Sequence, residues 1–288
     1  MSAPPRILSI AGSDSSGGAG IQADIKTITM LGGYAMTAIT AVTAQNTQGV
    51  TAVKVLSPDM VAAQIDACVS DIGVDAVKIG MLGSAGIADA VADRLVGMCV
   101  PIVFDPVMVA TSGSVLADEA TIAAFERLMA LATLTTPNTE ELASLSGSQV
   151  TNETEQGDAA GTVMARTGAS AILAKGGHLI LKGETYGVDP EGNAFRYDNS
   201  SRVFDFLYEI SPQGFWSERN WDSLRIHTRH THGTGCTLSS AIATYLGMGV
   251  ELTEAIDKAR QFVRAALEAA PGFGSGHGPM GHQAVRDL

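Results

Sequence analysis

Short apolar runs alternate along this chain with longer segments in which apolar residues recur every three or four positions. The short runs predict buried strands, at residues 6–11, 35–41, 76–79, 102–105, 134–136 and 171–175. The periodic segments predict helices, at about residues 19–31, 59–71, 85–97, 118–131, 139–146 and 154–167. This alternation is typical of a mainly parallel sheet with helices on both faces. Because ligands bind such sheets at the carboxyl ends of the strands, the residues that follow each strand are candidates for a functional site.

One more helical pattern begins near Thr234, directly after a glycine and close to a cysteine. The first turn of a helix leaves backbone N–H groups without partners and carries partial positive charge, so phosphate binds there readily. Gly233 and Gly235 would let such a ligand approach the backbone. The same field is expected to lower the pKa of the Cys236 thiol and so favour its thiolate as a base. An ordinary glycine loop beside a small buried cysteine is the alternative.

Composition and charge narrow the class of protein. The 288 residues, 45% of them hydrophobic, can bury a substantial core, and we expect a single domain over residues 1–288. The chain has 30 acidic and 18 basic residues and no basic cluster, so neither nucleic acid nor an anionic membrane is an expected partner. Three widely spaced cysteines argue against a disulfide framework or a structural zinc site. Without an apolar signal core or a long apolar run, we expect a soluble, cytoplasmic protein.

The glycine-rich motifs exclude two common ways of binding nucleotides. No GxxxxGK[ST] sequence occurs, which excludes a Walker loop. The GxGxxG sequence at residues 276–281 contains Pro279 and follows no predicted strand, so we do not expect it to bind a dinucleotide. Any bound phosphate therefore needs another site, such as the start of the helix near Thr234.

Several residues in or beside the strand-end loops have side chains that suit a small pocket. Gln45 can donate and accept hydrogen bonds together, and Asp24 can accept from an amino group. Met81 and Val107 can enclose a flat ring. Taken singly, each residue has a simpler interpretation, with the polar side chains bracing loops and the methionine filling the core.

A second group of strand-end residues could hold a hydrated metal ion and supply a cation. Asn138 with Glu141 three residues later is an ordinary helix cap, but the same oxygen atoms would suit a hydrated Mg²⁺. Lys175 offers a cation at another strand end, where a solvated edge charge is the alternative. The residues alone leave both interpretations open.

Six ordered motifs resemble those of the bacterial hydroxymethylpyrimidine/phosphomethylpyrimidine kinases of thiamin biosynthesis, within the ribokinase-like superfamily. They occupy residues 10–24, 43–47, 78–82, 136–138, 175–178 and 231–239. The similarity extends from about residue 6 to the tail at 276–279. It implies an α/β fold, a ribokinase-like three-layer α/β/α sandwich with a mainly parallel central sheet. It also implies transfer of the γ-phosphoryl group of ATP to a pyrimidine and then to its monophosphate.

The resemblance assigns roles to particular residues. The pyrimidine pocket would consist of Gly12, Asp24, Val42, Gln45, Met81 and Val107. The catalytic group, which includes the base and the donors that meet the transferred charge, would be Cys236, Gly235, Thr234, Gly233 and Lys175. The ATP contacts would be Lys175, Asn138 and Thr231. The Mg²⁺ site would be formed, in part through water, by Glu141, Asn138 and Asp105.

Two other functions stay open. A pyridoxal kinase would use the same loop and thiol, and a non-catalytic pyrimidine-binding protein could share the scaffold. A binding protein would not need Lys175, Asn138, Glu141 and Cys236 together, which argues against the second alternative. A homodimer is the expected assembly.

Residues 183–228 depart from the family pattern, because this part of the chain is longer than in typical relatives. More than half of the aromatic residues lie there: Phe195, Tyr197, Phe204, Phe206, Tyr208, Phe215, Trp216 and Trp221. The alternation at residues 204–208 predicts hairpin strands. We therefore expect an aromatic-rich hairpin insertion that pairs with the sheet or with a neighbour. A lid over the nucleotide, an oligomer contact and a decorated loop are the alternative roles.

Overall fold

The computed structural model describes residues 3–110, 113–177, 184–188, 194–198, 201–211 and 213–286. The chain divides into two compact units: Met1–Thr135 with Thr228–Leu288, called the first unit, and Thr136–His227, called the second unit. The single domain over residues 1–288 stays a prediction. His178 of the fifth motif and residues 183, 189–193, 199–200 and 212 of the predicted insertion lie outside the described residues.

The first unit contains a mainly parallel sheet. Its strands are β1 Arg6–Asp14, β2 Tyr34–Asn46, β3 Gly49–Val55, β4 Ala76–Ile79, β5 Ile102–Phe104 and β6 Leu134–Thr135. They lie in the order β6-β5-β4-β1-β2-β3, and β3 runs antiparallel to β2 while the other pairs are parallel. Every residue of β4 and β5 is buried, as expected for strands covered on both faces.

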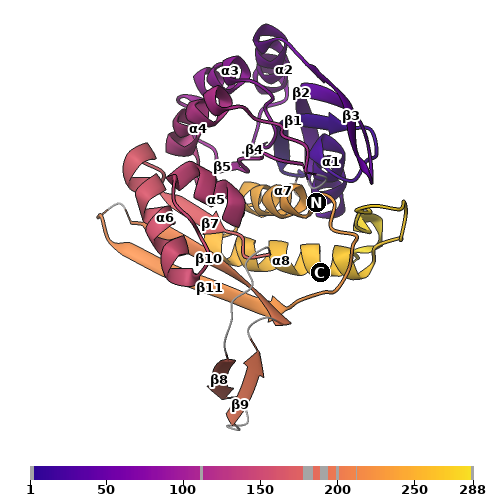
Figure 1. The fold of residues 1–288 in the computed structure, drawn as a ribbon. Coiled ribbons are helices and arrows are strands. Elements are labelled where there is room, and N and C mark those ends of the chain that lie inside the picture. The colour runs from indigo at the N-terminus through magenta and orange to yellow at the C-terminus, as the bar shows by residue number, and fades with distance from the viewer. Residues whose placement is uncertain are drawn as a thin grey trace. The chain divides into compact units, whose positions relative to one another are not determined.

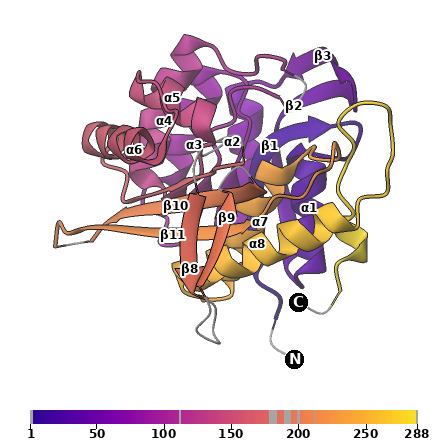
Figure 2. The same cartoon turned by 60° about the horizontal axis from the view of Figure 1, so that its bottom comes forward.

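Helices cover both faces of this sheet, as Figures 1 and 2 show. On one face α1 Gly20–Met30 and α7 Thr234–Gly247 pack against β1, and α8 Leu252–Glu268 packs against α7. On the other face α2 Pro58–Asp71 packs against β2 and α4 Glu119–Leu131 packs against β5, with α3 Ala85–Leu95 between these helices. Within the part of the chain that the structure describes, no helix is both long and apolar enough to cross a membrane.

The second unit contains the predicted aromatic hairpin. Strand β10 Arg202–Ile210 pairs antiparallel with both β7 Ala171–Ala174 and β11 Trp216–Leu224. The rings of Phe204, Phe206, Tyr208 and Trp216 follow one another with centroids 5.6 to 6.5 Å apart. Helices α5 Thr139–Ser146 and α6 Glu153–Thr167 pack together, and α6 covers β7 and β10. A separate antiparallel pair is formed by β8 Glu184–Val188 and β9 Ala194–Asp198. The hairpin prediction is therefore confirmed.

The structure also corrects the predicted elements. Strand β2 extends to Asn46 instead of ending at residue 41, because its last residues pair with β3, which was not predicted. Five of the seven residues of β3 are exposed, so this edge strand lacks a regular apolar pattern. Helix α8 was missed, although Ala255, Ile256, Ala259, Phe262 and Ala266 form its buried stripe.

Candidate active site

The start of α7 has the geometry of an anion site. Gly233 is the residue before the helix and has a φ of 85°, and among the described residues no side chain caps this end. The helix begins at Thr234, as predicted, so Gly235 and Cys236 lie in its first turn. Unoccupied N–H groups in a first turn, combined with the helix dipole, favour a bound anion.

The loop between β1 and α1 passes directly over this helix start. A methyl group on Gly233 would collide with the carbonyl oxygen of Gly18 and lie 3.1 Å from the Cα atom of Ala19. A methyl group on Gly18 would in turn collide with the ring of His232. Glycine is therefore required at both positions for the two segments to meet.

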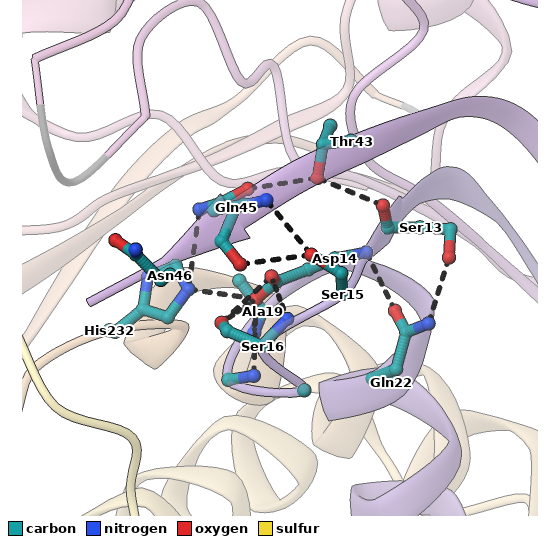
Figure 3. A network of polar contacts seen from close by, with 12 residues as sticks. Ser13, Asp14, Ser15, Ser16, Ala19, Gln22, Thr43, Gln45, Asn46 and His232 are labelled. Carbon is teal, nitrogen blue, oxygen red and sulfur yellow. Dashed lines mark hydrogen bonds and ion pairs between the residues drawn. The ribbon is translucent and has the colours of Figure 1, made fainter. Parts of the chain in front are cut away.

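Asp14 joins the same two segments through its carboxylate (Figure 3). One carboxylate oxygen accepts from the backbone N–H and hydroxyl of Ser16, both at 2.8 Å. The other accepts from the backbone N–H groups of Ala19 at 2.8 Å and Gly18 at 3.1 Å, and lies 2.8 Å from Nε2 of His232. Asp14 and His232 are 3% and 4% exposed, so this network is shielded from solvent.

Burial alone would raise the pKa of Asp14, but the hydrogen bonds from His232, Ser16 and Ala19 outweigh it and lower the pKa below the ordinary value. The carboxylate is therefore ionised at neutral pH. Because its pKa is lower in the folded chain than in the unfolded chain, ionised Asp14 stabilises the fold above the ordinary aspartate value of about 3.9. This contribution is lost as the pH falls through the lowered folded value.

We expect Asp14→Asn to reduce the free energy of unfolding by about 2 kcal/mol at pH 7, because charge-assisted hydrogen bonds are replaced by weaker ones. The difference from the unsubstituted protein should shrink as the pH falls below about 4, where Asp14 of the unfolded chain begins to take up a proton, and continue to shrink down to the lower pKa of the folded chain. Urea unfolding at pH 7, 5 and 3 measures both effects. Asp257→Asn, on the exposed face of α8, is the matched control and should change little. A loss for Asp14→Asn that stays constant with pH would contradict this account.

Gln45 belongs to the same network (Figure 3). Its side-chain nitrogen lies 3.4 Å from Nε2 of His232, and its side-chain oxygen accepts from the Thr43 hydroxyl at 3.2 Å. Its backbone N–H donates to Ser15 Oγ at 2.8 Å. Gln45 lies within β2 and not after it, so the strand itself carries this polar side chain to the loop before α7.

Residues 276–282 also contact the loop before α7 and Thr47 after β2. The backbone N–H of His232 donates to Gly278 O at 3.2 Å, and the N–H of His277 donates to Thr47 O at 2.8 Å. Behind the helix start, Thr237 Oγ1 lies 2.8 Å from Nε2 of His282, which is 1% exposed. Burial lowers the pKa of His282 to about 4, with the Lys26 charge acting in the same direction, so this imidazole is neutral at pH 7.

The predicted lowering of the Cys236 pKa is wrong. Desolvation of the thiol raises its pKa to about 11, and Asp24 and Asp105 add to this. Lys78 and the backbone N–H of Gly20 act in the opposite direction but do not compensate. Loss of hydration therefore outweighs the field of the helix start, and the thiol is protonated at pH 7.

Asp24 is fully buried in an ion pair with Lys78. Its carboxylate accepts from Lys78 Nζ at 2.9 and 3.0 Å, from Ser9 Oγ at 2.6 Å and from Ser240 Oγ at 2.7 Å. Both charged side chains have no exposed area. The structure thus gives the Asp24 carboxylate three protein partners, where the sequence suggested contact with an amino group of a ligand.

The remaining acceptor-side residues lie in the first unit. Gly12 is buried against Met81, whose sulfur would be 2.9 Å from a methyl group at position 12. Met81 and Val107 are partly buried, whereas Val42 is 48% exposed on β2. Gly12 and Met81 are therefore brought together, and Val42 faces solvent. Two further predicted residues, Thr231 before α7 and Asp105 after β5, are partly buried and buried respectively.

The nucleotide-side residues predicted in the second unit form one polar cluster. Asn138 and Glu141 make a reciprocal capping box at the start of α5, with bonds of 2.8 and 2.7 Å. The backbone N–H of Lys175 donates to Pro137 O at 2.9 Å, which fixes this residue beside the cap. Lys175 Nζ lies 3.8 Å from the Glu141 carboxylate. The capping interpretation is confirmed, and the cap also faces a cation.

Within the described ranges, no group of three or more His, Cys, Asp or Glu side chains is arranged to hold a metal. The donors at Asn138 and Glu141 are oxygen atoms, which Mg²⁺ prefers. Mg²⁺ commonly keeps several water molecules and binds through one or two carboxylates and substrate phosphates. The residues present therefore fit a hydrated Mg²⁺ better than a metal enclosed by protein.

Three functional candidates were missed from the sequence. Asp14 and His232 stood inside recognised motifs, but 218 residues separate them and only the fold brings them together. Lys78 did leave a signal, because a lysine within the buried run Ala76–Ile79 needs a partner of opposite charge.

Comparison with known proteins gives the family. A family model described as phosphomethylpyrimidine kinase matches residues 14–281. The hydroxymethylpyrimidine/phosphomethylpyrimidine kinase of Rhizobium meliloti is 47% identical over 279 residues, which cover 96% of each chain. The thiamine biosynthesis bifunctional protein ThiED of Geobacter sulfurreducens is 44% identical over 96% of this chain, which spans 52% of that protein's length.

Among solved structures, an ADP complex of Bacillus subtilis pyridoxal kinase is similar, with a TM-score of 0.81, 32% identity and coverage of 98% of both chains. The predicted ribokinase-like α/β fold is confirmed by this likeness together with the mainly parallel sheet. The family model spans nearly the whole chain, and the two named relatives are 44% and 47% identical to it. The chain belongs to the phosphomethylpyrimidine kinase family.

Proposed function

We propose that this protein uses ATP to phosphorylate 4-amino-5-hydroxymethyl-2-methylpyrimidine and then the resulting monophosphate, giving the diphosphate. The observation that carries the proposal is the uncapped start of α7, with Cys236 in its first turn and Gln45 joined to it through His232. One segment thereby offers N–H groups for a phosphate and lies beside an amide that suits an aminopyrimidine.

On the acceptor side, Gln45 hydrogen-bonds the aminopyrimidine while Met81 and Val107 contact the faces of its ring. Gly12 allows the ring to approach the backbone, and Val42 closes the outer edge. Asp24 contributes through its ion pair with Lys78, since three protein groups already occupy its carboxylate.

On the nucleotide side, Lys175, Asn138 and Thr231 bind ATP. Mg²⁺, when bound near Glu141, Asn138 and Asp105 through water, neutralises phosphate charge. Phosphoryl transfer asks mainly for positioning and for stabilisation of charge on the peripheral oxygens. The N–H groups of Gly233, Thr234, Gly235 and Cys236 supply that stabilisation together with Lys175.

Cys236 is the proposed base for the alcohol. With a thiol pKa of about 11, only a small fraction is thiolate at neutral pH. The step therefore depends on nearby positive charge, which favours the thiolate. In the second phosphorylation the attacking phosphate oxygen is already ionised, so no base is required.

ATP consumption with hydroxymethylpyrimidine, its monophosphate and pyridoxal as separate and competing acceptors tests the function. We expect turnover with both pyrimidines and little with pyridoxal. Lys175→Met should abolish the turnover, whereas Lys54→Met, exposed on β3, should retain it and so exclude a contaminating kinase. A preference for pyridoxal would favour the pyridoxal kinase function instead. No turnover with any of the three acceptors would refute both enzyme functions.

That the protein is a cytoplasmic homodimer stays a prediction. Sedimentation of the purified chain measures the oligomeric state directly.

A further inference from the structure

The core of the first unit contains a buried ion pair between Lys78 and Asp24. Lys78 is the only charged residue of β4, and its ammonium and the Asp24 carboxylate are both fully buried. Burial alone would lower the pKa of Lys78, but the negative charges of Asp24 and Asp105 raise it above its ordinary value. Lys78 is therefore a permanent buried cation at neutral pH.

Stability alone does not explain this pair. Desolvating two charges generally cancels much of their attraction, and apolar side chains of similar volume are often equally stable or better. Both side chains are fully buried, and Ser9 and Ser240 also donate to the Asp24 carboxylate. A role in setting the charge around a reacting group accounts for its presence better than core packing does.

The ion pair is about one helical turn away from the starts of α1 and α7, and the Cys236 thiol lies in the first turn of α7. Asp24 accepts from Ser240, which is four residues after Cys236 on α7. Asp24 itself is four residues after Gly20 at the start of α1, and the preceding residues Gly18 and Ala19 lie against Gly233 at the start of α7. Since four residues make about one turn, α1 and α7 present Gly20 and Cys236 on the faces that carry Asp24 and Ser240.

We propose that Lys78 is a positioning residue whose buried ammonium favours the thiolate of Cys236, and that Asp24 sets how much of this positive charge acts on the sulfur. The inference deepens the proposed function, since it concerns the same thiol. Among the described residues, the charges that act on the Cys236 thiol come from Lys78 on β4, Asp24 on α1 and Asp105 after β5. Lys78 opposes the two carboxylates, so changes at Lys78 and at Asp24 should act with opposite sign.

The reactivity of the thiol toward iodoacetamide tests this without any substrate. Cys68 and Cys99 are also free thiols, so both are first replaced by alanine to leave Cys236 alone. Alkylation rates between pH 7 and 9 are then compared for the parent, Asp24→Asn, and Asp24→Asn with Lys78→Met. The double change avoids an unpaired buried carboxylate, and circular dichroism with cooperative urea unfolding checks that each variant is folded.

We expect Asp24→Asn to react about three- to tenfold faster than the parent at a given pH. Adding Lys78→Met should slow the reaction by about the same factor relative to Asp24→Asn. A nearby charge shifts a pKa by about one unit or more, and a higher thiolate nucleophilicity offsets part of that change in the rate. Lys54→Met on exposed β3 is the matched control and should leave the rate unchanged.

Equal rates for Asp24→Asn with and without Lys78→Met would overturn the proposal. If the double variant does not fold, the comparison of Asp24→Asn with the parent decides alone. An alkylation rate for Asp24→Asn that is slower than or equal to that of the parent also overturns the proposal. The result is independent of the proposed function. If none of the acceptors is phosphorylated but the alkylation rates follow the expected order, the kinase proposal fails and the inference about Lys78 stands.

Discussion

Alanine in place of Gly233 is expected to lower kcat/KM for the pyrimidine by at least about a hundredfold. Gly233 has a φ of 85°, and a methyl group there would collide with the Gly18 carbonyl oxygen. The loop between β1 and α1 must then move away from the start of α7. This displaces the N–H groups proposed to bind the transferred phosphate, which steady-state kinetics with varied pyrimidine would detect.

Gly249→Ala separates this collision from simple backbone strain. Gly249 has a φ of 81°, close to that of Gly233, but no heavy atom lies within 4 Å of the position that a methyl group would occupy. Both substitutions should reduce stability by about 1–2 kcal/mol through their positive φ. Only Gly233→Ala should lower kcat/KM by about a hundredfold. Similar kinetic losses in the two variants would show that the contact between Gly18 and Gly233 is not needed for the site.

The second large effect is expected for Cys236→Ala, which should slow phosphorylation of the alcohol by about a hundredfold. Phosphorylation of the monophosphate should slow much less, because its attacking oxygen carries no proton that must be removed. Cys236→Ser should show the same asymmetry, since a hydroxyl has a much higher pKa than a thiol and almost never forms the anion that accepts the proton. Single-turnover reactions that separate the monophosphate from the diphosphate measure the two steps independently.

Cys99→Ala, at an exposed position away from α7, is the matched control and should leave both steps unchanged. Equal losses in both steps for Cys236→Ala would indicate that the side chain packs the helix start and does not accept a proton. Unfolding curves at neutral pH would then show a matching loss of stability for the variant.

Elements with clear local signals could be predicted from the sequence. Helix α5 spans Thr139–Ser146 as predicted, because Asn138 with Glu141 caps its start and Gly147 in the left-handed region ends it. The start of α7 at Thr234 was predicted in the same way from Gly233. Strand β2 was predicted too short, since its final residues are strand only because β3 pairs with them. Pairing with a distant or exposed strand produces no regular spacing of apolar residues in the sequence.

In the site, too, local signals could be predicted from the sequence and properties that depend on packing could not. The residue types, Cys236 after a glycine turn and Gln45 near a strand end, could be selected from the sequence. The pKa of Cys236 could not, because its direction depends on how completely the thiol is desolvated by packing. The partner of Asp24 also depends on the fold, since Lys78 reaches it across 54 residues of chain.

The contacts of residues 276–282 with the loop before α7 determine when the site can form during synthesis of the chain. The contacts that complete the proposed acceptor side join residues 218 and 229 positions apart, as in Asp14 with His232 and Thr47 with Gly276. Such long-range contacts form late and slow the folding of a domain. On the ribosome, the sheet of β1, β2 and β4 can assemble early, but the emerging chain has no means of catalysis until residues 230–282 have left the exit tunnel. Substrate therefore meets the completed site only after residue 282 has left the tunnel.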